Sequence, residues 1–240
     1  MHTFLFSVTA LAAFFAVAVF FETRYKGEPL TAAILIPSLF QKRAVIEGYQ
    51  HTELVEVVFQ KTKAYRPDKP WTAMADVSTV LDFGGGCGIH YKQANSPTVR
   101  WAVVETPAMA ERAKELATSR LQFFTNIPDA QRWLGDVDAI HSNGALQYAD
   151  DPATVLKQLC AVQAKTMLWS RLRLSKGTIE RELQSSRLRD NGPGKIRIED
   201  KTVRYEMTRI PEKEFIAAHA GYELAERGED WFRFSLKSPS

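Results

Sequence analysis

The chain has 240 residues, which is enough for one domain of ordinary size with an additional segment. Its 45% hydrophobic and 25% charged content is that of a folded globular protein and argues against long disorder. The net charge of +3 is too small to indicate a nucleic-acid partner. Cys87 and Cys160 have no His or Cys partner at ligand spacing, so we expect two reduced thiols, no disulfide framework and no metal site.

The N-terminus departs from this average. Residues 3–21, "TFLFSVTALAAFFAVAVFF", carry no charge over 19 residues, close to the roughly 20 that cross a bilayer as a helix. We therefore expect residues 1–22 to be an uncleaved transmembrane anchor. A signal peptide is the main alternative, because residues 16–18 resemble a cleavage site, although no Lys or Arg precedes the apolar run. A buried helix of a soluble protein is the third, weakened by the absence of a polar face.

Positive charges follow this hydrophobic helix, at Arg24, Lys26, Lys42 and Arg43. The positive-inside bias then predicts a single-pass membrane protein whose C-terminal domain faces the cytoplasm. Residues 23–44 are expected to form a juxtamembrane segment, and its apolar run "LTAAILIPSLF" lies on the membrane surface or packs on the domain. The remaining residues, 45–240, are expected to form one domain.

Strands and helices alternate through most of this domain. An amphipathic helix is predicted over residues 49–66. Predicted strands at 78–84, 100–105, 121–124, 137–143 and 165–172 are separated by helices after Gly88 and at 107–119, 129–135 and 151–163. A helix at 211–221 then precedes a hairpin of strands at 222–228 and 231–237. This repetition predicts a parallel sheet with an antiparallel terminal hairpin.

A glycine-rich turn, "VLDFGGGCGIHY" at residues 80–91, joins the first of these strands to the next helix. Glycines there allow a ligand to approach the backbone closely. The dinucleotide fingerprint needs glycines at i, i+2 and i+5, but a series starting at Gly84 or Gly86 ends at Ile89 or Tyr91. A nicotinamide oxidoreductase is therefore disfavoured.

Two acids indicate a different ligand. Asp82 ends the strand before the first glycine, where a carboxylate opposes a pyrophosphate and favours an ammonium group. Glu105 ends the next strand, 17 residues past Gly88, where a carboxylate accepts hydrogen bonds from both hydroxyls of a ribose. Together they predict a ligand with an amino-acid end and a nucleoside end, and S-adenosylmethionine has both.

The segments "VLDFGGGCG", "WAVVE" and "DAIHSNGALQYADDP" resemble the glycine loop, the acidic second strand and the fourth-strand segment of class I S-adenosylmethionine-dependent methyltransferases, over roughly residues 78 to 237. More narrowly, "LDFGGGCGIHY", "YQHTELVEVV" and "RIPEKEFIAAHAGYEL" are similar to uncharacterised bacterial putative methyltransferases, some of them linked to surface-polysaccharide genes. The resemblance implies an α/β, Rossmann-like, doubly wound sheet of seven strands, in the order 3-2-1-4-5-7-6, with the last strand antiparallel.

The resemblance also implies contacts with the cofactor. The glycines and Asp82 would hold the methionine end and Glu105 the ribose, while Asn126 or a backbone group near Ile127 would replace the acid that often contacts the adenine. The full set of implied cofactor residues is Asp82, Gly84, Gly85, Gly86, Gly88, Glu105, Thr106, Asn126 and Asn143.

Candidate catalytic residues follow the strand ends where the acceptor would bind. They are His90, His141 and Tyr148, although a histidine or tyrosine there more often serves packing or hydrogen bonding. The Asn/Asp-Pro-Pro-Tyr/Phe segment of enzymes that methylate amines of bases is absent, so no nucleic acid is expected and the acceptor is a small molecule, a sugar or a lipid-linked precursor. The alternative function is a membrane-tethered, non-catalytic cofactor-binding module. The sequence does not define the oligomeric state.

Residues 170–209 contain 11 Lys or Arg and 6 Asp or Glu. Two interpretations stay open. This insertion covers an acceptor pocket, where its basic excess meets an anionic substrate or lipid head group, or it is a solvated helix and loop.

Overall fold

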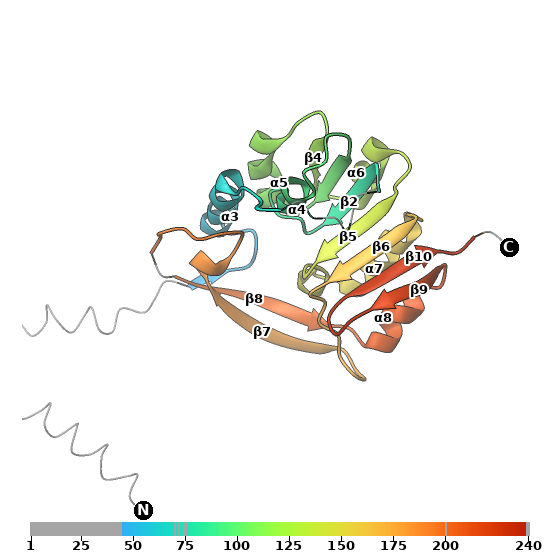
Figure 1. Ribbon diagram of the computed structural model, residues 1–240. Coiled ribbons are helices and arrows are strands. Elements are labelled where there is room, and N and C mark those ends of the chain that lie inside the picture. The colour runs from blue at the N-terminus through green and yellow to red at the C-terminus, as the bar shows by residue number, and fades with distance from the viewer. Residues whose placement is uncertain (1–44, 70, 72, 74–75, 200, 239–240) are drawn as a thin grey trace, which may run out of the picture. The chain divides into compact units, whose positions relative to one another are not determined.

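The computed structural model describes residues 45–69, 71, 73, 76–199 and 201–238 (Figure 1). The predicted anchor and juxtamembrane segment, residues 1–44, lie outside this part, and so does the hydrophobic helix expected at the N-terminus. Among the helices that the structure describes, none combines the length and the apolar character needed to cross a bilayer.

Seven strands form the main sheet, in the order β4-β3-β2-β5-β6-β10-β9. Numbered by chain order within this sheet, they run 3-2-1-4-5-7-6. Strand β10 is antiparallel to both neighbours and the strands from β4 to β6 are parallel, so the predicted strand order is confirmed. The strands are β2 (Thr79–Phe83), β3 (Arg100–Val104), β4 (Leu121–Phe124), β5 (Ala139–Asn143), β6 (Thr166–Ser170), β9 (Tyr222–Arg227) and β10 (Phe232–Leu236).

Helices cover both faces of this sheet, as expected for a doubly wound fold (Figure 1). One face packs against α3 (Thr52–Ala64), α4 (Ile89–Ala94) and α5 (Pro107–Ala113). The other packs against α6 (Ile127–Leu134), α7 (Pro152–Ala161) and α8 (Glu212–Ala218). The described part of the chain also contains three short 3-10 helices, η3 (Lys114–Leu116), η4 (Leu146–Tyr148) and η5 (Leu188–Asp190).

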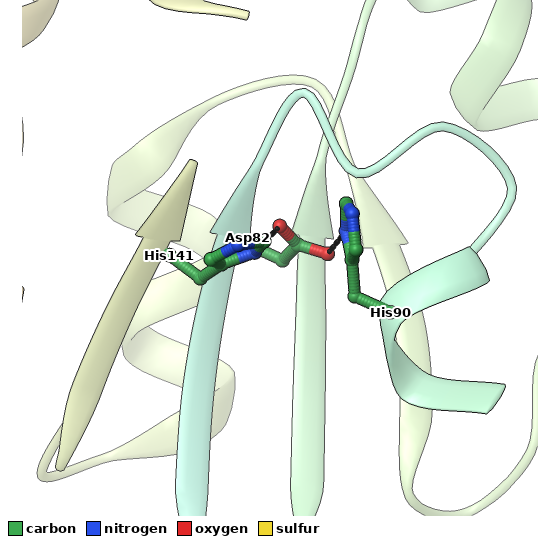
Figure 2. A group of neighbouring side chains, drawn as sticks. All are labelled: Asp82, His90 and His141. Atoms are coloured by element: carbon green, nitrogen blue, oxygen red, sulfur yellow. Dashed lines mark hydrogen bonds and ion pairs between the residues drawn. The ribbon is translucent and has the colours of Figure 1, made fainter. Parts of the chain in front are cut away.

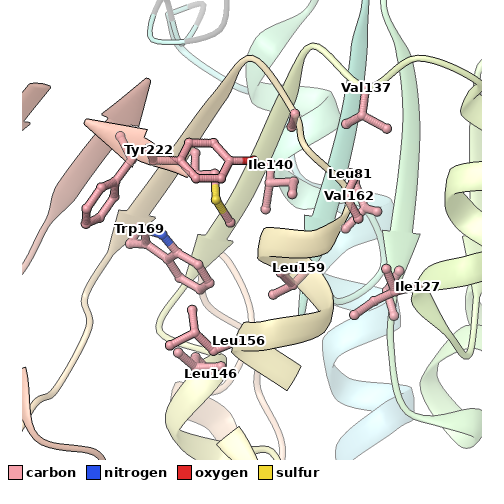
Figure 3. Close-up of a cluster of buried hydrophobic side chains, with 14 of the residues drawn as sticks. Leu81, Ile127, Val137, Ile140, Leu146, Leu156, Leu159, Val162, Trp169 and Tyr222 are labelled. Atoms are coloured by element: carbon pink, nitrogen blue, oxygen red, sulfur yellow. The ribbon is translucent and has the colours of Figure 1, made fainter. Parts of the chain in front are cut away.

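The larger apolar cluster lies between the sheet and α6, α7 and α8 (Figure 3). Leu81 and Ile140 come from adjacent central strands, Leu159 from α7 and Trp169 from β6, and all are essentially inaccessible to solvent. Burying each side chain of this size stabilises the fold by about 1.5–3 kcal/mol. This face therefore fixes the carboxyl ends of β2, β5 and β6 relative to one another.

Much of the insertion at residues 170–209 is an antiparallel hairpin of β7 (Glu180–Arg187) and β8 (Thr202–Arg209). The interpretation of this segment as a solvated helix and loop is therefore wrong for these residues. Strand β1 (Val45–Glu47) pairs in parallel with β8, which gives a three-stranded sheet in the order β1-β8-β7. The physical reason lies in β8, where buried Val203, Tyr205 and Met207 alternate with exposed residues at the period of a half-buried strand.

Candidate functional site

The glycine turn between β2 and α4 is tightly packed against its own chain. Gly84 has a φ of 70°, and a Cβ added there would lie 2.0 Å from the Cβ of Ala145. A Cβ added at Gly85 would lie 2.3 Å from Oδ2 of Asp82. Gly88, the N-cap of α4, has a φ of 84° and faces Leu121. These three glycines are therefore required by packing or backbone conformation before any ligand is considered.

Gly86 differs from the other three. Its φ of 59° again favours glycine, but an added Cβ would meet only Val58 within 4 Å, at the ordinary contact distance of 3.6 Å. Its backbone N–H donates to Oε1 of Glu105 at 2.9 Å. The backbone of Gly86 therefore lies against the predicted ribose-binding carboxylate of Glu105, and the space around the Cα atom of Gly86 is largely open.

Glu105 follows directly after β3 and is partly buried. Its Oε2 accepts a hydrogen bond from the Thr106 N–H at 2.8 Å. Burial raises the pKa of Glu105, while the N–H groups of Thr106 and Gly86 partly offset this and the charge of Asp82 adds to it. Each carboxylate oxygen accepts one backbone hydrogen bond and retains capacity for another.

Asp82 lies at the centre of a buried polar cluster, and its carboxylate is fully inaccessible to solvent. Oδ1 accepts from His141 Nδ1 at 2.8 Å, and Oδ2 accepts from His90 Nδ1 at 2.9 Å and from Trp101 Nε1 at 3.1 Å. Figure 2 shows the carboxylate between the two imidazoles. Burial by itself raises the pKa of Asp82, but His90 and His141 outweigh it and hold this pKa well below its usual range.

This carboxylate fixes the tautomers of both histidines. An ionised carboxylate only accepts hydrogen bonds, so Nδ1 carries the proton in each ring. In a neutral ring Nε2 is then an acceptor, and His90 Nε2 accepts from Nδ2 of Asn143 at 3.2 Å. Burial lowers the pKa of His141, although the charge of Asp82 opposes this, and the lowered pKa favours the neutral ring. Its Nε2 has no hydrogen-bond partner among the residues that the structure describes.

A cavity of about 600 Å³ opens beside this cluster, at the carboxyl ends of β5 and β6. The ring of Trp71 lies 4.9 Å from that of His141, between centroids. The volume is that of a site for a small organic molecule. Its wall includes His90, His141, Asn143, Ser170, Trp71 and Trp231.

Asp82, His90 and His141 are also a group that could hold a metal ion. Ligand atoms around a tetrahedral ion with bonds of about 2.0–2.1 Å lie about 3.3 Å apart. The 2.8 and 2.9 Å separations between Nδ1 and carboxylate oxygen are shorter and are ordinary hydrogen-bond lengths. The geometry is therefore that of a hydrogen-bonded cluster.

Several buried acceptors near this edge of the sheet lack a hydrogen-bond partner within the described part of the chain. Each such atom costs about 1–3 kcal/mol unless a partner satisfies it. These atoms are Thr106 Oγ1, Ser142 Oγ, Asn143 Oδ1 and Gln147 Oε1. Of the four residues, only Asn143 lines the cavity beside Asp82.

Two other predicted residues have structural partners. Asn126 caps α6, because its Oδ1 accepts from the Asp129 N–H at 2.9 Å and its Nδ2 donates to the Asp129 carboxylate. Tyr148 donates its hydroxyl to Oε1 of Gln184 at 2.6 Å and packs against the rings of Tyr49 and Tyr205. The roles of Asn126 toward adenine and of Tyr148 in catalysis stay predictions.

The sequence interpretation missed two tryptophans of the site. Trp101 could have been anticipated, because an acid in an apolar strand needs donors and Trp101 lies on the neighbouring strand, opposite Val80. Trp71 gave no such signal, since "RPDKPW" reads only as a break after the first helix of the domain. Its place beside His141 depends on the tertiary fold.

No protein-family model matches the chain, and no curated protein matches it. Among solved structures, the sugar N-methyltransferase KedS8 from Streptoalloteichus sp. is 18% identical over 89% of this chain and 96% of that chain, with a TM-score of 0.45. CalS10 from Micromonospora echinaspora, an amino pentose methyltransferase with S-adenosylmethionine bound, is 17% identical over 89% and 100%, with a TM-score of 0.45. MtfA, a glycopeptide N-methyltransferase complexed with sinefungin, is 11% identical over 87% and 97%, with a TM-score of 0.49.

Likenesses at these levels assign no reaction to this chain. The strand order does define its class of fold, because 3-2-1-4-5-7-6 with an antiparallel last strand is the order that the resemblance to class I S-adenosylmethionine-dependent methyltransferases implies. The chain therefore has the fold of that class.

The packing of Gly85 on Asp82 generates a stability prediction. Gly85→Ala places a methyl group against Oδ2, and we expect the displaced hydrogen bonds to cost about 2–4 kcal/mol of unfolding free energy in urea titrations. Gly177→Ala is the matched control, since no atom lies within 4 Å of its added Cβ, and its effect should stay within about 0.5 kcal/mol. Equal stability of the two variants would contradict the packing described.

Proposed function

We propose that this protein is an S-adenosylmethionine-dependent methyltransferase that acts on a small molecule or a sugar. The observation that carries the proposal is the Glu105 carboxylate, which the N–H groups of Gly86 and Thr106 hold beside the glycine turn. That arrangement presents a ribose acceptor at the end of the second strand of the sheet. Asn143 Oδ1, which is unpaired among the described residues, supplies a further polar partner for the same ligand.

The residues fit the two ends of this cofactor. Glu105 would bind the ribose hydroxyls, and the backbone of Gly86 would lie beside the ligand. Oδ1 of Asn143, buried and unpaired among the described residues, suits the ammonium group of the methionine end. The cofactor, when bound, supplies an electrophilic methyl group.

Asp82 would orient the amino group of the cofactor indirectly, through His90 and Asn143. Its carboxylate is enclosed by three N–H donors, so its influence on a ligand passes through His90 to Asn143. His90 orients the Asn143 amide, which leaves Oδ1 directed to the ligand. We therefore assign His90 a positioning role.

His141 is the better candidate for a general base. Asp82 holds its Nδ1–H, its neutral ring keeps a lone pair on Nε2, and it lines the 600 Å³ cavity. A hydroxyl or ammonium group of an acceptor in this cavity would lose its proton to that nitrogen. The indoles of Trp71 and Trp231, together with the polar groups of the wall, suit a sugar ring.

Cofactor binding tests the first part of this function. By isothermal titration with the full-length protein, Glu105→Ala should weaken S-adenosylmethionine or S-adenosylhomocysteine binding by about 1.5–3 kcal/mol, roughly 10- to 150-fold. Glu111→Ala, an exposed glutamate on α5, is the control and should leave the affinity unchanged. A folded wild-type protein that binds neither ligand would contradict the proposal, and binding without turnover on any acceptor would favour the non-catalytic module.

The pH profile tests the base. Because burial lowers the pKa of His141, the fall in kcat/KM for methyl transfer as the ring takes up a proton should begin at a lower pH than for an unperturbed imidazole, whose pKa is about 6.5. His141→Gln should lower kcat by about 100-fold or more and remove this acidic limb. His51→Gln, at the N-cap of α3, should keep both the rate and the limb. An unchanged limb in His141→Gln would exclude His141 as the base.

We also propose that residues 1–22 anchor the protein in the membrane with its domain in the cytoplasm, where a lipid-linked sugar precursor is a candidate acceptor. The support is the uncharged run of 19 residues and the Lys and Arg residues that follow it. After cell fractionation and a carbonate wash, the full-length protein should stay in the membrane pellet. Recovery of the full-length protein in the supernatant would contradict this attachment.

A further inference from the structure

Strand β7 is the outer strand of the three-stranded sheet, and no described strand pairs with its free side (Figure 1). Its eight residues, "ERELQSSR", include no Pro and no Lys, and its pairing with β8 has no bulge. Natural edge strands are often protected by charged side chains, especially Lys, by Pro or by bulges, because unpaired N–H and C=O groups are a template for another strand. Strand β7 carries the charges of Glu180, Arg181, Glu182 and Arg187, but it has neither Pro nor a bulge, so its outer N–H and C=O groups remain available for pairing.

The register with β8 shows which backbone groups are free. The Leu188 N–H donates to the Lys201 carbonyl, and the pairing runs on without a shift to Glu180 opposite Arg209. Hydrogen-bonded pairs alternate along an antiparallel strand, so the even-numbered residues of β7 direct their backbone groups to β8. The residues whose N–H and C=O point away from the sheet are Arg181, Leu183, Ser185 and Arg187.

Exposed apolar side chains gather on the same strand. In the described part of the chain three large hydrophobic residues are exposed, and two of them are Leu183 (62% exposed) and Ile179 (54%), on β7 or just before it. Leu183 lies on the opposite face of the hairpin from buried Tyr205 and Met207. The free edge therefore carries an apolar group at its centre.

We propose that β7 pairs antiparallel with β7 of a second copy of this chain, about a two-fold axis at Leu183. The two three-stranded sheets would join into one sheet of six strands. Leu183 would contact Leu183 of the partner subunit, which removes the most exposed large apolar side chain among the described residues from water.

Charge complementarity selects this register from its neighbours. An axis at Glu182 sets Glu182 opposite Glu182 of the partner subunit, and an axis at Gln184 sets Arg181 opposite Arg187 of the partner subunit. The axis at Leu183 sets Arg181 opposite the partner's Ser185 and Glu182 opposite the partner's Gln184, so no like charges oppose each other directly. Glu182 is also neutralised by Arg209 of its own chain, at 2.7 Å. A two-fold axis midway between two residues would set a residue whose backbone groups point outward opposite one whose groups point to β8, and the two could not form hydrogen bonds.

Pairing through β7 would also affect the candidate site, because Gln184 of this strand accepts a hydrogen bond from the hydroxyl of Tyr148. A dimer that holds β7 in place therefore also holds Tyr148, which lies at the carboxyl edge of the main sheet. This consequence does not depend on the reaction that the site performs.

Cysteine cross-linking tests the register in the full-length protein, purified in mild detergent, with Cys160→Ser as background. Residues opposite each other in a hydrogen-bonded pair have Cα atoms about 5.5 Å apart, within disulfide range. Leu183→Cys should therefore form a covalent dimer on mild oxidation, while Glu182→Cys and Gln184→Cys, each offset from the axis, should not. Absence of the dimer for Leu183→Cys, or equal cross-linking at all three positions, would overturn the proposal.

Sedimentation equilibrium tests the association itself. The wild-type protein should be a dimer at micromolar concentration, and Leu183→Arg should be a monomer with an unchanged circular dichroism spectrum. Leu236→Arg is the matched control, since Leu236 is also exposed but lies on β10, and it should stay a dimer. A monomeric wild-type protein would overturn the proposal, and coverage of β7 by residues 1–44 is one arrangement that would give this result. A dimer that persists in Leu183→Arg would overturn it as well.

Discussion

The buried carboxylate of Asp82 is the group around which the site is arranged. A charge without contact to solvent is tolerated only if hydrogen bonds replace its hydration, and here three N–H groups do so. They come from three elements that the strand order places around β2: Trp101 on β3, His141 on β5 and His90 on α4. The absence of a side chain at Gly85 leaves the space that this carboxylate needs.

The two histidines of this cluster make different contacts with their second ring nitrogen. His90 Nε2 accepts a hydrogen bond from Asn143, whereas His141 lines the cavity and its Nε2 has no partner among the described residues. The two acids at the ends of β2 and β3 also have pKa values that move in opposite directions. At Asp82 the two imidazoles outweigh burial, whereas at Glu105 burial outweighs the two backbone N–H groups. A sheet edge that separates its polar groups in this way is suited to hold a ligand with chemically different ends.

Much of the fold could be predicted from the sequence, because the parallel strands are short apolar runs and the helices between them are periodic. The strand order came from the resemblance and was confirmed, and Glu105 lies beside the glycine turn as expected. The hairpin of β7 and β8 was harder to predict, since every residue of β7 is exposed or only partly buried and no alternation marks it as a strand. The partners of Asp82 could not be read from spacing, because His141 is 59 residues away and meets it through the pairing of β2 with β5.

The most direct test of this account is the protonation of the imidazole nitrogens, measured by long-range nitrogen–proton NMR at pH 7.5 on nitrogen-labelled protein and assigned with His90→Gln and His141→Gln. Nδ1 should carry the proton in both rings, Nε2 of His141 should be unprotonated, and Asp82→Asn should abolish the shared preference for Nδ1. An Nδ1 without a proton in either ring of the wild-type protein, or shifts typical of metal coordination, would contradict this arrangement.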